Sequence, residues 1–188
     1  MEYTQLARLL VTESVYDRIK EQEAALFRLL PELQVCKGFD QRNSWHTYDV
    51  YEHILHVVAG VETDKILRLT ALFHDIGKPP VFTLDADGVG HFFGHWDASR
   101  EIFQRYAPRL GLSPREIALI DALIFYHDMN VDKMTDAEIR TMVAALGKEN
   151  LPKLFAIKRS DLLAQSSAYH HLLANLQRQE QTVLEAAV

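Results

Sequence analysis

The sequence predicts an all-α fold, a helical bundle interrupted by one short β-hairpin around residues 81–93. Apolar residues recur at helical spacing along most of the 188 residues. Capping boxes mark two helix starts, at Ser113–Glu116 and Thr135–Glu138. The one stretch of different character surrounds Asp87-Gly88, a pair that is typical of hairpin turns.

The first half of the chain predicts four helices and one loop. The helices are expected over Thr4–Val11, Ser14–Leu30, about Tyr48–Gly60, and Asp64–His74. Their apolar residues lie three and four positions apart, which is the spacing of a buried helix face. Pro31 cannot donate a backbone hydrogen bond, so we expect it to close the second helix. Residues 31–46 are expected to form a loop.

Helices resume after the hairpin. The first two are expected over Trp96–Leu110 and Ser113–Tyr126. A third begins at Thr135, a fourth runs from about Pro152 to Ser166, and a last helix continues to the C-terminus. We expect a single domain over residues 1–188. Its core spans about residues 45–166, with helices of residues 1–30 and 168–186 packed on that core.

The composition excludes several classes of protein. The net charge is −6 and the lysines and arginines are scattered, so we expect no binding to a long nucleic acid. A local cluster of metal and lysine can still attract a small polyanion.

Cys36 is the only cysteine, so no intrachain disulfide can form. No apolar run approaches the roughly 20 residues of a membrane helix, and no signal peptide is visible, so we expect a cytoplasmic protein. The oligomeric state stays open.

Histidine is unusually frequent, with nine copies. His53 lies inside an apolar stripe, three residues after Val50 and four before Val57. Such a histidine is either a core residue with one satisfied hydrogen bond or a ligand aimed into the interior. His127 falls on an apolar face in the same way, three residues after Ile124.

His74 and Asp75 end a helix that is apolar on most sides, from Ile66 to Phe73. An unpaired buried carboxylate is costly or becomes protonated, and a bound metal ion removes that penalty. The alternative is an ordinary helix end, with His74 near the negative end of the helix dipole and Asp75 starting a turn.

Asp161 also occupies a core-facing position, on one helix face with Leu154 and Ile157. The alternative is an ordinary ion pair with Lys158, three residues earlier. Imidazoles and carboxylates from separate helices are the groups with which helical bundles bind transition metals. The combination of these residues therefore indicates a metal site.

Four motifs carry a resemblance to a known family. They are "YDVYEHILH", "ALFHDIGKP", "FFGHWDAS" and "KRSDLLAQS". In this order they resemble the HD-domain metal-dependent phosphohydrolase superfamily of the HDIG type, over about residues 45–166. The local likeness is to the HD domains of bacterial tRNA nucleotidyltransferases. The resemblance implies an HD-domain helical bundle.

The polymerase head of those tRNA enzymes is not visible in this sequence. The chain has no Gly-Ser dipeptide, and its only Asp-x-Asp, Asp85–Asp87, precedes Gly88 in the predicted hairpin turn. The nucleotide-adding activity is therefore not implied.

The resemblance implies one or two divalent ions of manganese, iron, nickel, cobalt or zinc. The ligands of the first ion would be His53, His74, Asp75 and Asp161. A second ion would add His95 and His127, with Asp75 bridging the two. His91 competes with His95 for that place, although "FFGH" in the motif favours His95.

The implied activity is hydrolysis of a small phosphate ester, such as a nucleotide, including the 2′,3′-cyclic kind. Asp75 would hold the nucleophilic water. Lys78 would contact a phosphate oxygen, unless it is a solvent-facing turn residue. Two alternatives stay open: a di-iron oxygenase of the HD type and an HD binding module without turnover.

Further candidates flank these residues in the sequence. Lys158, Arg159 and His56 are candidates for substrate binding. His46 and His56 are candidates for orienting a ligand or protonating the leaving group.

Overall fold

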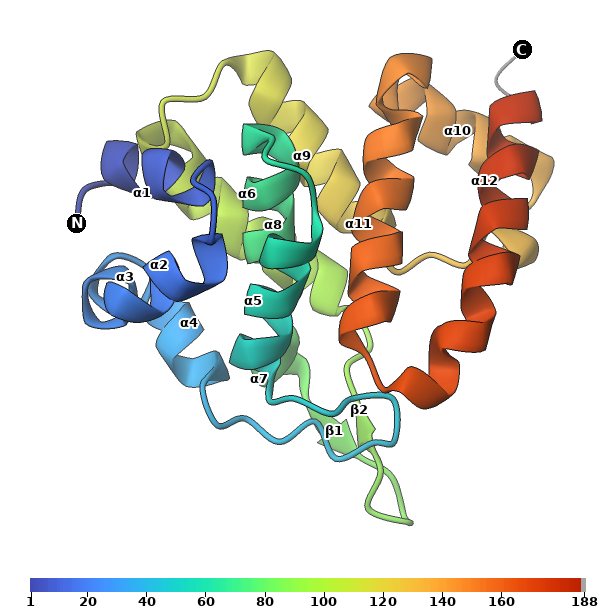
Figure 1. Ribbon diagram of the computed structural model, residues 1–188. Helices are drawn as coiled ribbons and strands as arrows, with labels where there is room; N and C mark the ends of the chain where they lie inside the picture. The colour runs from blue at the N-terminus through green and yellow to red at the C-terminus, as the bar shows by residue number, and fades with distance from the viewer. Residues whose placement is uncertain (187–188) are drawn as a thin grey trace.

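Helices α5 (Val50–Gly60) and α6 (Lys65–Phe73) lie at the centre of the computed structural model, which describes residues 1–186 (Figure 1). All residues of α6 from Ile66 to Phe73 are buried, because neighbours surround this mostly apolar helix. Helix α5 packs against α6 and α11 (Leu151–Ala164), and α6 also packs against α9 (Pro114–Tyr126). The helices expected to carry the site thus form the interior of the bundle.

The other elements surround this centre. Among the described residues they are α1 (Tyr3–Leu10), α2 (Val15–Glu21), α3 (Glu23–Leu29), α4 (Pro31–Cys36), α7 (Lys78–Val81), β1 (Thr83–Leu84), β2 (Gly90–His91), α8 (His95–Tyr106), α10 (Asp136–Leu146) and α12 (Leu173–Ala186). Short 3₁₀ segments join several of them. The predicted all-α bundle with one small hairpin is confirmed.

The N-terminal region differs from the prediction in two places. The helix expected over Ser14–Leu30 is two helices, α2 and α3, because the backbone of Gln22 leaves helical geometry (φ −111°, ψ 14°). The loop expected over residues 31–46 begins with α4. Pro31 opens this helix rather than only ending the preceding one, since a proline at the first helical position loses no intrahelical hydrogen bond. Leu33 and Cys36 of α4 are buried, which ties it to the core.

The hairpin pairs β1 with β2 in antiparallel register, Thr83 opposite His91 and Leu84 opposite Gly90. Gly90 also packs directly on the loop before α5, where its N–H donates to the Arg42 carbonyl at 2.7 Å. A Cβ at this position would lie 2.1 Å from the Gln41 carbonyl oxygen, so only glycine permits this approach. The hairpin and the loop consequently form one wall.

The outer helices cover the core on both sides, with α1 packed on α6 and α12 packed on α11. The extent of the single domain stays a prediction, and residues 187–188 lie outside the described part of the chain. Over residues 1–186, no helix combines the length and the apolar character that crossing a membrane requires.

Candidate metal centre

Helix α5 places His53 in the interior. Asp49 caps the helix by accepting a hydrogen bond from the Glu52 N–H at 2.7 Å, which sets where the helix begins. The apolar stripe predicted from the sequence faces α6 and α11, and His53 is fully buried within it. The position of His53 therefore follows directly from the helical period.

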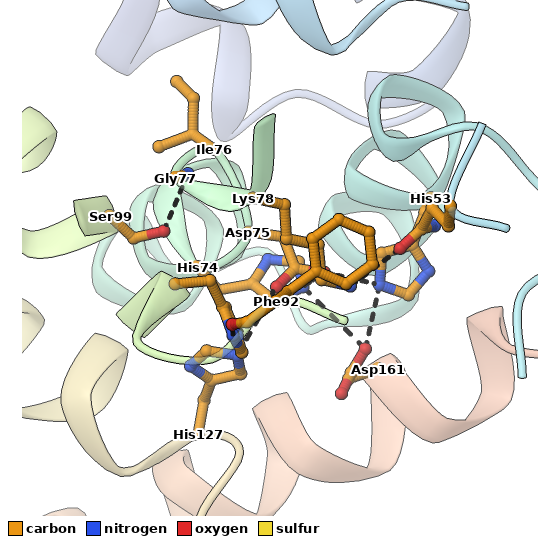
Figure 2. A network of polar contacts seen from close by, with 12 residues as sticks. His53, His74, Asp75, Ile76, Gly77, Lys78, Phe92, Ser99, His127 and Asp161 are labelled. Carbon is orange, nitrogen blue, oxygen red and sulfur yellow. Dashed lines mark hydrogen bonds and ion pairs between the residues drawn. The ribbon is translucent and has the colours of Figure 1, made fainter. Parts of the chain in front are cut away.

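The His74-Asp75 pair lies where α6 ends and the chain turns toward α8. Gly77 allows α8 to approach this turn, because a Cβ there would lie 2.4 Å from the Ser99 backbone nitrogen. The Gly77 N–H donates to the Ser99 hydroxyl at 2.9 Å (Figure 2). This contact joins the turn to the helix that begins with His95.

Four side chains from α5, α11 and the end of α6 meet in a first cluster, namely His53, His74, Asp75 and Asp161 (Figure 2). One ligand atom from each lies within 4.8 Å of the others. His53 Nε2 is 3.2 Å from Asp75 Oδ2 and 2.9 Å from Asp161 Oδ1. His74 Nε2 is 3.3 Å from Asp75 Oδ2 and 3.8 Å from Asp161 Oδ1.

A second cluster lies on the other side of the Asp75 carboxylate. His95 Nε2 is 3.3 Å and His127 Nε2 is 3.6 Å from Asp75 Oδ1. Ligand atoms of these three residues also lie within 4.8 Å of one another. One oxygen of Asp75 thus faces each cluster, which is the geometry of a bridging carboxylate.

Backbone carbonyls orient three of the histidines. The Nδ1 atoms of His74, His95 and His127 lie 2.7, 2.9 and 2.6 Å from the carbonyl oxygen of the residue three positions earlier. A carbonyl only accepts, so each Nδ1 carries the proton and each Nε2 is left to face the centre. Such bonds are the usual support of metal-binding histidines.

The unpaired atoms of the centre fit a bound cation. Within residues 1–186, His53 Nε2, His74 Nε2 and Asp75 Oδ1 are buried without a hydrogen-bond partner. Buried polar atoms rarely lack one. In addition, the Nε2 atoms of His95 and His127 lie 3.2 Å apart. With both Nδ1 atoms protonated, these two lone pairs repel unless a positive charge lies between them.

Both carboxylates of the centre are held in their charged form. Burial raises the pKa of Asp75, but the neighbouring His74 imidazole and Lys78 ammonium group outweigh this effect and keep the pKa well below its usual range. Burial also raises the pKa of Asp161, and the imidazoles of His53 and His74 reverse that shift. Two ionised carboxylates in a buried cluster favour a positive charge between them.

Lys78 lies inside the site, so it is not the solvent-facing turn residue of the alternative interpretation. Its Nζ is 2.6 Å from Asp75 Oδ2, 2.9 Å from Gln41 Oε1 and 5.2 Å from the centre of the Phe92 ring. Its side chain is only 7% exposed. The ammonium group is therefore fixed beside the carboxylate that joins the two clusters.

A cavity of about 330 Å³ opens onto the centre. Asp75, Asp161 and Lys78 line it together with an aromatic wall that includes Trp45 and Phe93. Its size is near the lower end of the range of small-molecule sites, about 300–1,000 Å³.

The structure separates His91 from His95. His91 Nε2 is 2.9 Å from Asp85 Oδ2, and its ring stacks on Phe93. It borders the cavity but lies outside both clusters. The geometry therefore favours His95 as the ligand.

Two predicted substrate-binding residues, Lys158 and Arg159, make other contacts. Lys158 Nζ donates to the carbonyls of His127 and Met129 at 2.7 and 2.8 Å. Arg159 forms an ion pair with Glu180 at 2.9 Å. Lys158 thus supports the backbone at the end of α9. The ion pair with Glu180 does not support substrate binding by Arg159, and that role stays a prediction.

His56 and His46 differ in their relation to the cavity. The ring of His56 stacks on Tyr48 at 4.2 Å, and this histidine does not line the cavity. His46 does line it. Burial and the charge of Lys78 lower the pKa of His46 to about 3, so its imidazole is neutral near pH 7 and is a poor proton donor to a leaving group.

Two residues of the site have no signal in the sequence. Gln41 is buried, accepts from Lys78 and donates to the Tyr48 carbonyl at 3.2 Å. Trp45 lines the cavity. Both belong to the irregular segment between α4 and α5, where no periodicity indicates which side chains point inward.

A model of the HD domain matches residues 44–187, which is most of the chain. The chain belongs to the HD domain family. All six residues of the two clusters fall within the matched range, so the HD domain contains the whole candidate metal centre. The family predicted from the motifs is confirmed.

The curated relatives of this HD domain are longer proteins. An A-adding tRNA nucleotidyltransferase of Deinococcus radiodurans is 33% identical over 138 residues, covering 70% of this chain and 31% of that protein. A bifunctional uridylyltransferase/uridylyl-removing enzyme of Streptomyces coelicolor is 29% identical over 162 residues, covering 79% of this chain and 18% of that protein. A CC-adding tRNA nucleotidyltransferase of Thermus thermophilus is 35% identical over 106 residues, covering 52% and 24%. This chain spans less than a third of each.

Proposed function

We propose that this HD domain is a metal-dependent hydrolase of a small phosphate ester, and that its substrate is a nucleotide, including the 2′,3′-cyclic kind. The observation that carries the proposal is the Asp75 carboxylate, whose two oxygens face two separate histidine clusters. The residues that would hold one or two divalent ions are His53, His74, Asp75, Asp161, His95 and His127. Manganese, iron, nickel, cobalt and zinc all suit this mixture of imidazole and carboxylate.

Asp75 and Lys78 have separate roles in the proposed hydrolysis. A divalent ion in such a site acidifies water and offsets the charge of phosphoryl oxygens. Asp75 orients the attacking water as a hydrogen-bond acceptor, and Lys78 donates to a non-bridging phosphate oxygen. The water oxygen bonds to phosphorus while the bond to the leaving oxygen breaks. That oxygen takes up a proton from solvent, and the water releases one.

Two observations support a small nucleotide over a long nucleic acid. The cavity holds about 330 Å³, and the net charge of the chain is −6. The names of the relatives concern nucleotide addition to tRNA and the transfer or removal of uridylyl groups. Because this chain spans only a small part of those proteins, we carry over the nucleotide class and none of their activities.

A cytoplasmic location stays a prediction.

The test combines metal analysis with a substrate panel. Protein purified without chelators is analysed for bound metals and then assayed with manganese, nickel or cobalt against phosphomonoesters, phosphodiesters and 2′,3′-cyclic nucleotides. We expect hydrolysis that His74→Ala and Asp75→Ala abolish together with metal binding. Arg115→Ala is the control and should keep both, because Arg115 is exposed, pairs with Glu149 and does not line the cavity.

Each other outcome contradicts the proposal in a distinct way. Two irons per chain with oxygen uptake and no phosphate release would identify an oxygenase. Firmly bound metal without turnover of any ester would identify a binding module. Full metal content in His74→Ala would overturn the ligand assignment itself.

A further inference from the structure

The loop before α5 places Trp45 at the metal cavity. This residue is 43% exposed and lines the cavity. Tyr169, from the 3₁₀ segment Ser167–Leu172, stacks on it with ring centres 3.7 Å apart and planes at 15°. The Ser166 N–H donates to the Trp45 carbonyl at 2.8 Å, and the hydroxyls of Ser44 and Tyr169 lie 2.7 Å apart. These contacts hold the indole in a fixed position, so it is a rigid aromatic surface.

An unused amide lies beside this surface. Gln165 precedes Ser166, the residue bonded to Trp45, and it lines the same cavity. In the part of the chain that the structure describes, Gln165 Oε1 is buried and has no hydrogen-bond partner. A buried acceptor without a donor is costly, so a donor that enters the cavity and reaches this oxygen would gain a favourable hydrogen bond.

We propose that Trp45 and Gln165 form a nucleobase subsite beside the metal centre. The base stacks on the part of the indole that Tyr169 leaves uncovered, and Gln165 Oε1 accepts a hydrogen bond from an exocyclic amino group of the base. Stacking on an aromatic side chain and amide recognition of adenine are both established modes of base binding. The assignment rests on the proposed function, which places the phosphate at Lys78 and the metal centre in the same cavity.

The competing explanation is that Trp45 only fastens its loop to the segment around Tyr169. That role makes a prediction of its own, because loosening the loop would weaken every ligand of the cavity alike. A base subsite instead affects only ligands that carry a base. The matched pair of probes is therefore adenosine 5′-monophosphate and ribose 5-phosphate, which differ by the base alone.

The binding experiment uses the manganese-loaded protein and isothermal titration calorimetry. We expect Trp45→Ala to weaken binding of adenosine 5′-monophosphate about tenfold or more and to leave ribose 5-phosphate unchanged. Trp45→Phe should restore most of the affinity. If the nucleotide is turned over, the same comparison is made with kcat/KM. Equal losses for both probes, or no loss for either, would overturn the subsite.

Fluorescence gives a second measurement. The chain has two tryptophans, so the Trp96→Phe variant reports on Trp45 alone. Adenosine 5′-monophosphate should quench this signal, and ribose 5-phosphate should not. Gln165→Leu should remove any preference for adenosine 5′-monophosphate over purine riboside 5′-monophosphate, which lacks the amino group. An unchanged preference would exclude Gln165 from base recognition.

The two proposals can fail separately. Hydrolysis of phosphate esters without base-dependent binding would retain the proposed function and refute the subsite. Base-dependent binding without hydrolysis of any ester would support the subsite and refute the proposed function.

Discussion

Asp75 is the residue through which the two clusters are coupled. Its oxygens lie near His53 and His74 on one side and near His95 and His127 on the other. The four histidines approach it from different elements. A single substitution at residue 75 therefore affects both clusters, whereas each histidine can be tested alone.

Variants of His95 and His91 test which of these histidines binds the second ion. His95→Ala should remove the second ion and leave the first, because only the cluster around Asp75 Oδ1 loses a ligand. His91→Ala is the matched control, since His91 borders the same cavity but contacts Asp85. Metal content per chain is measured by elemental analysis. Loss of metal in the His91 variant and not in the His95 variant would reverse the assignment.

Lys158 is expected to act through His127. Its ammonium group holds the carbonyls of His127 and Met129, which lie just beyond α9. Lys158→Met leaves these carbonyls without their donor, and we expect the affinity of the second ion to fall about tenfold, as for other residues that support metal ligands. Titration with manganese measures both affinities. An equal loss at both ions would point to general destabilisation.

At the scale of elements, helical periodicity indicated that His53, His127 and Asp161 lie on apolar helix faces, and all three contribute to the two clusters. The break at Gln22 was not predictable, since glutamine is an ordinary helix residue and no glycine or proline lies beside it. Helix α4 was missed because Pro31 is compatible both with ending one helix and with starting the next.

The capping box of α9 makes stability depend on pH. Glu116 pairs with Lys65 at 2.6 Å and accepts hydrogen bonds from Ser113, and these contacts lower its pKa from 4.5 to about 2. A lowered folded-state pKa gives stability that is present above about pH 4.5 and is lost as the pH falls toward about 2. Because the pair is partly exposed, we expect Glu116→Gln to cost only about 1 kcal/mol.

Urea unfolding at several pH values tests this expectation. The difference between wild type and Glu116→Gln should be largest near neutral pH and should shrink in acid. Glu149→Gln is the control, because the Arg115–Glu149 pair is exposed and should contribute little. A difference that persists unchanged at low pH would show that the carboxylate charge is not responsible.

At the scale of the molecule, the sequence could indicate each helix face but not how the faces meet. The core-facing positions of His53, Asp75 and Asp161 indicated a metal site, and only the family resemblance specified the set of ligands. The sequence also provided no indication of the roles of Gln41, Trp45 and Gln165. Their roles depend on how irregular segments fold over the cavity, and such segments carry no periodic pattern.

Metal removal should destabilise the whole bundle. The ligands come from α5, α8, α11 and the ends of α6 and α9, so an ion bound among them favours the folded state. We expect chelation to lower the Tm and re-addition of manganese to restore it. Asp75→Ala, which removes a ligand from both clusters, is the control, and its Tm should respond much less to chelator. An unchanged Tm in the chelated wild type would contradict metal binding by these residues.

The distance along the chain between His53 and Asp161 has a consequence during synthesis. A ribosome must complete α11 before the first cluster has its second carboxylate, so a partly made chain cannot capture the ion with its full set of ligands. On the proposed function, an ion can therefore gain its full set of ligands only after α11 has been made.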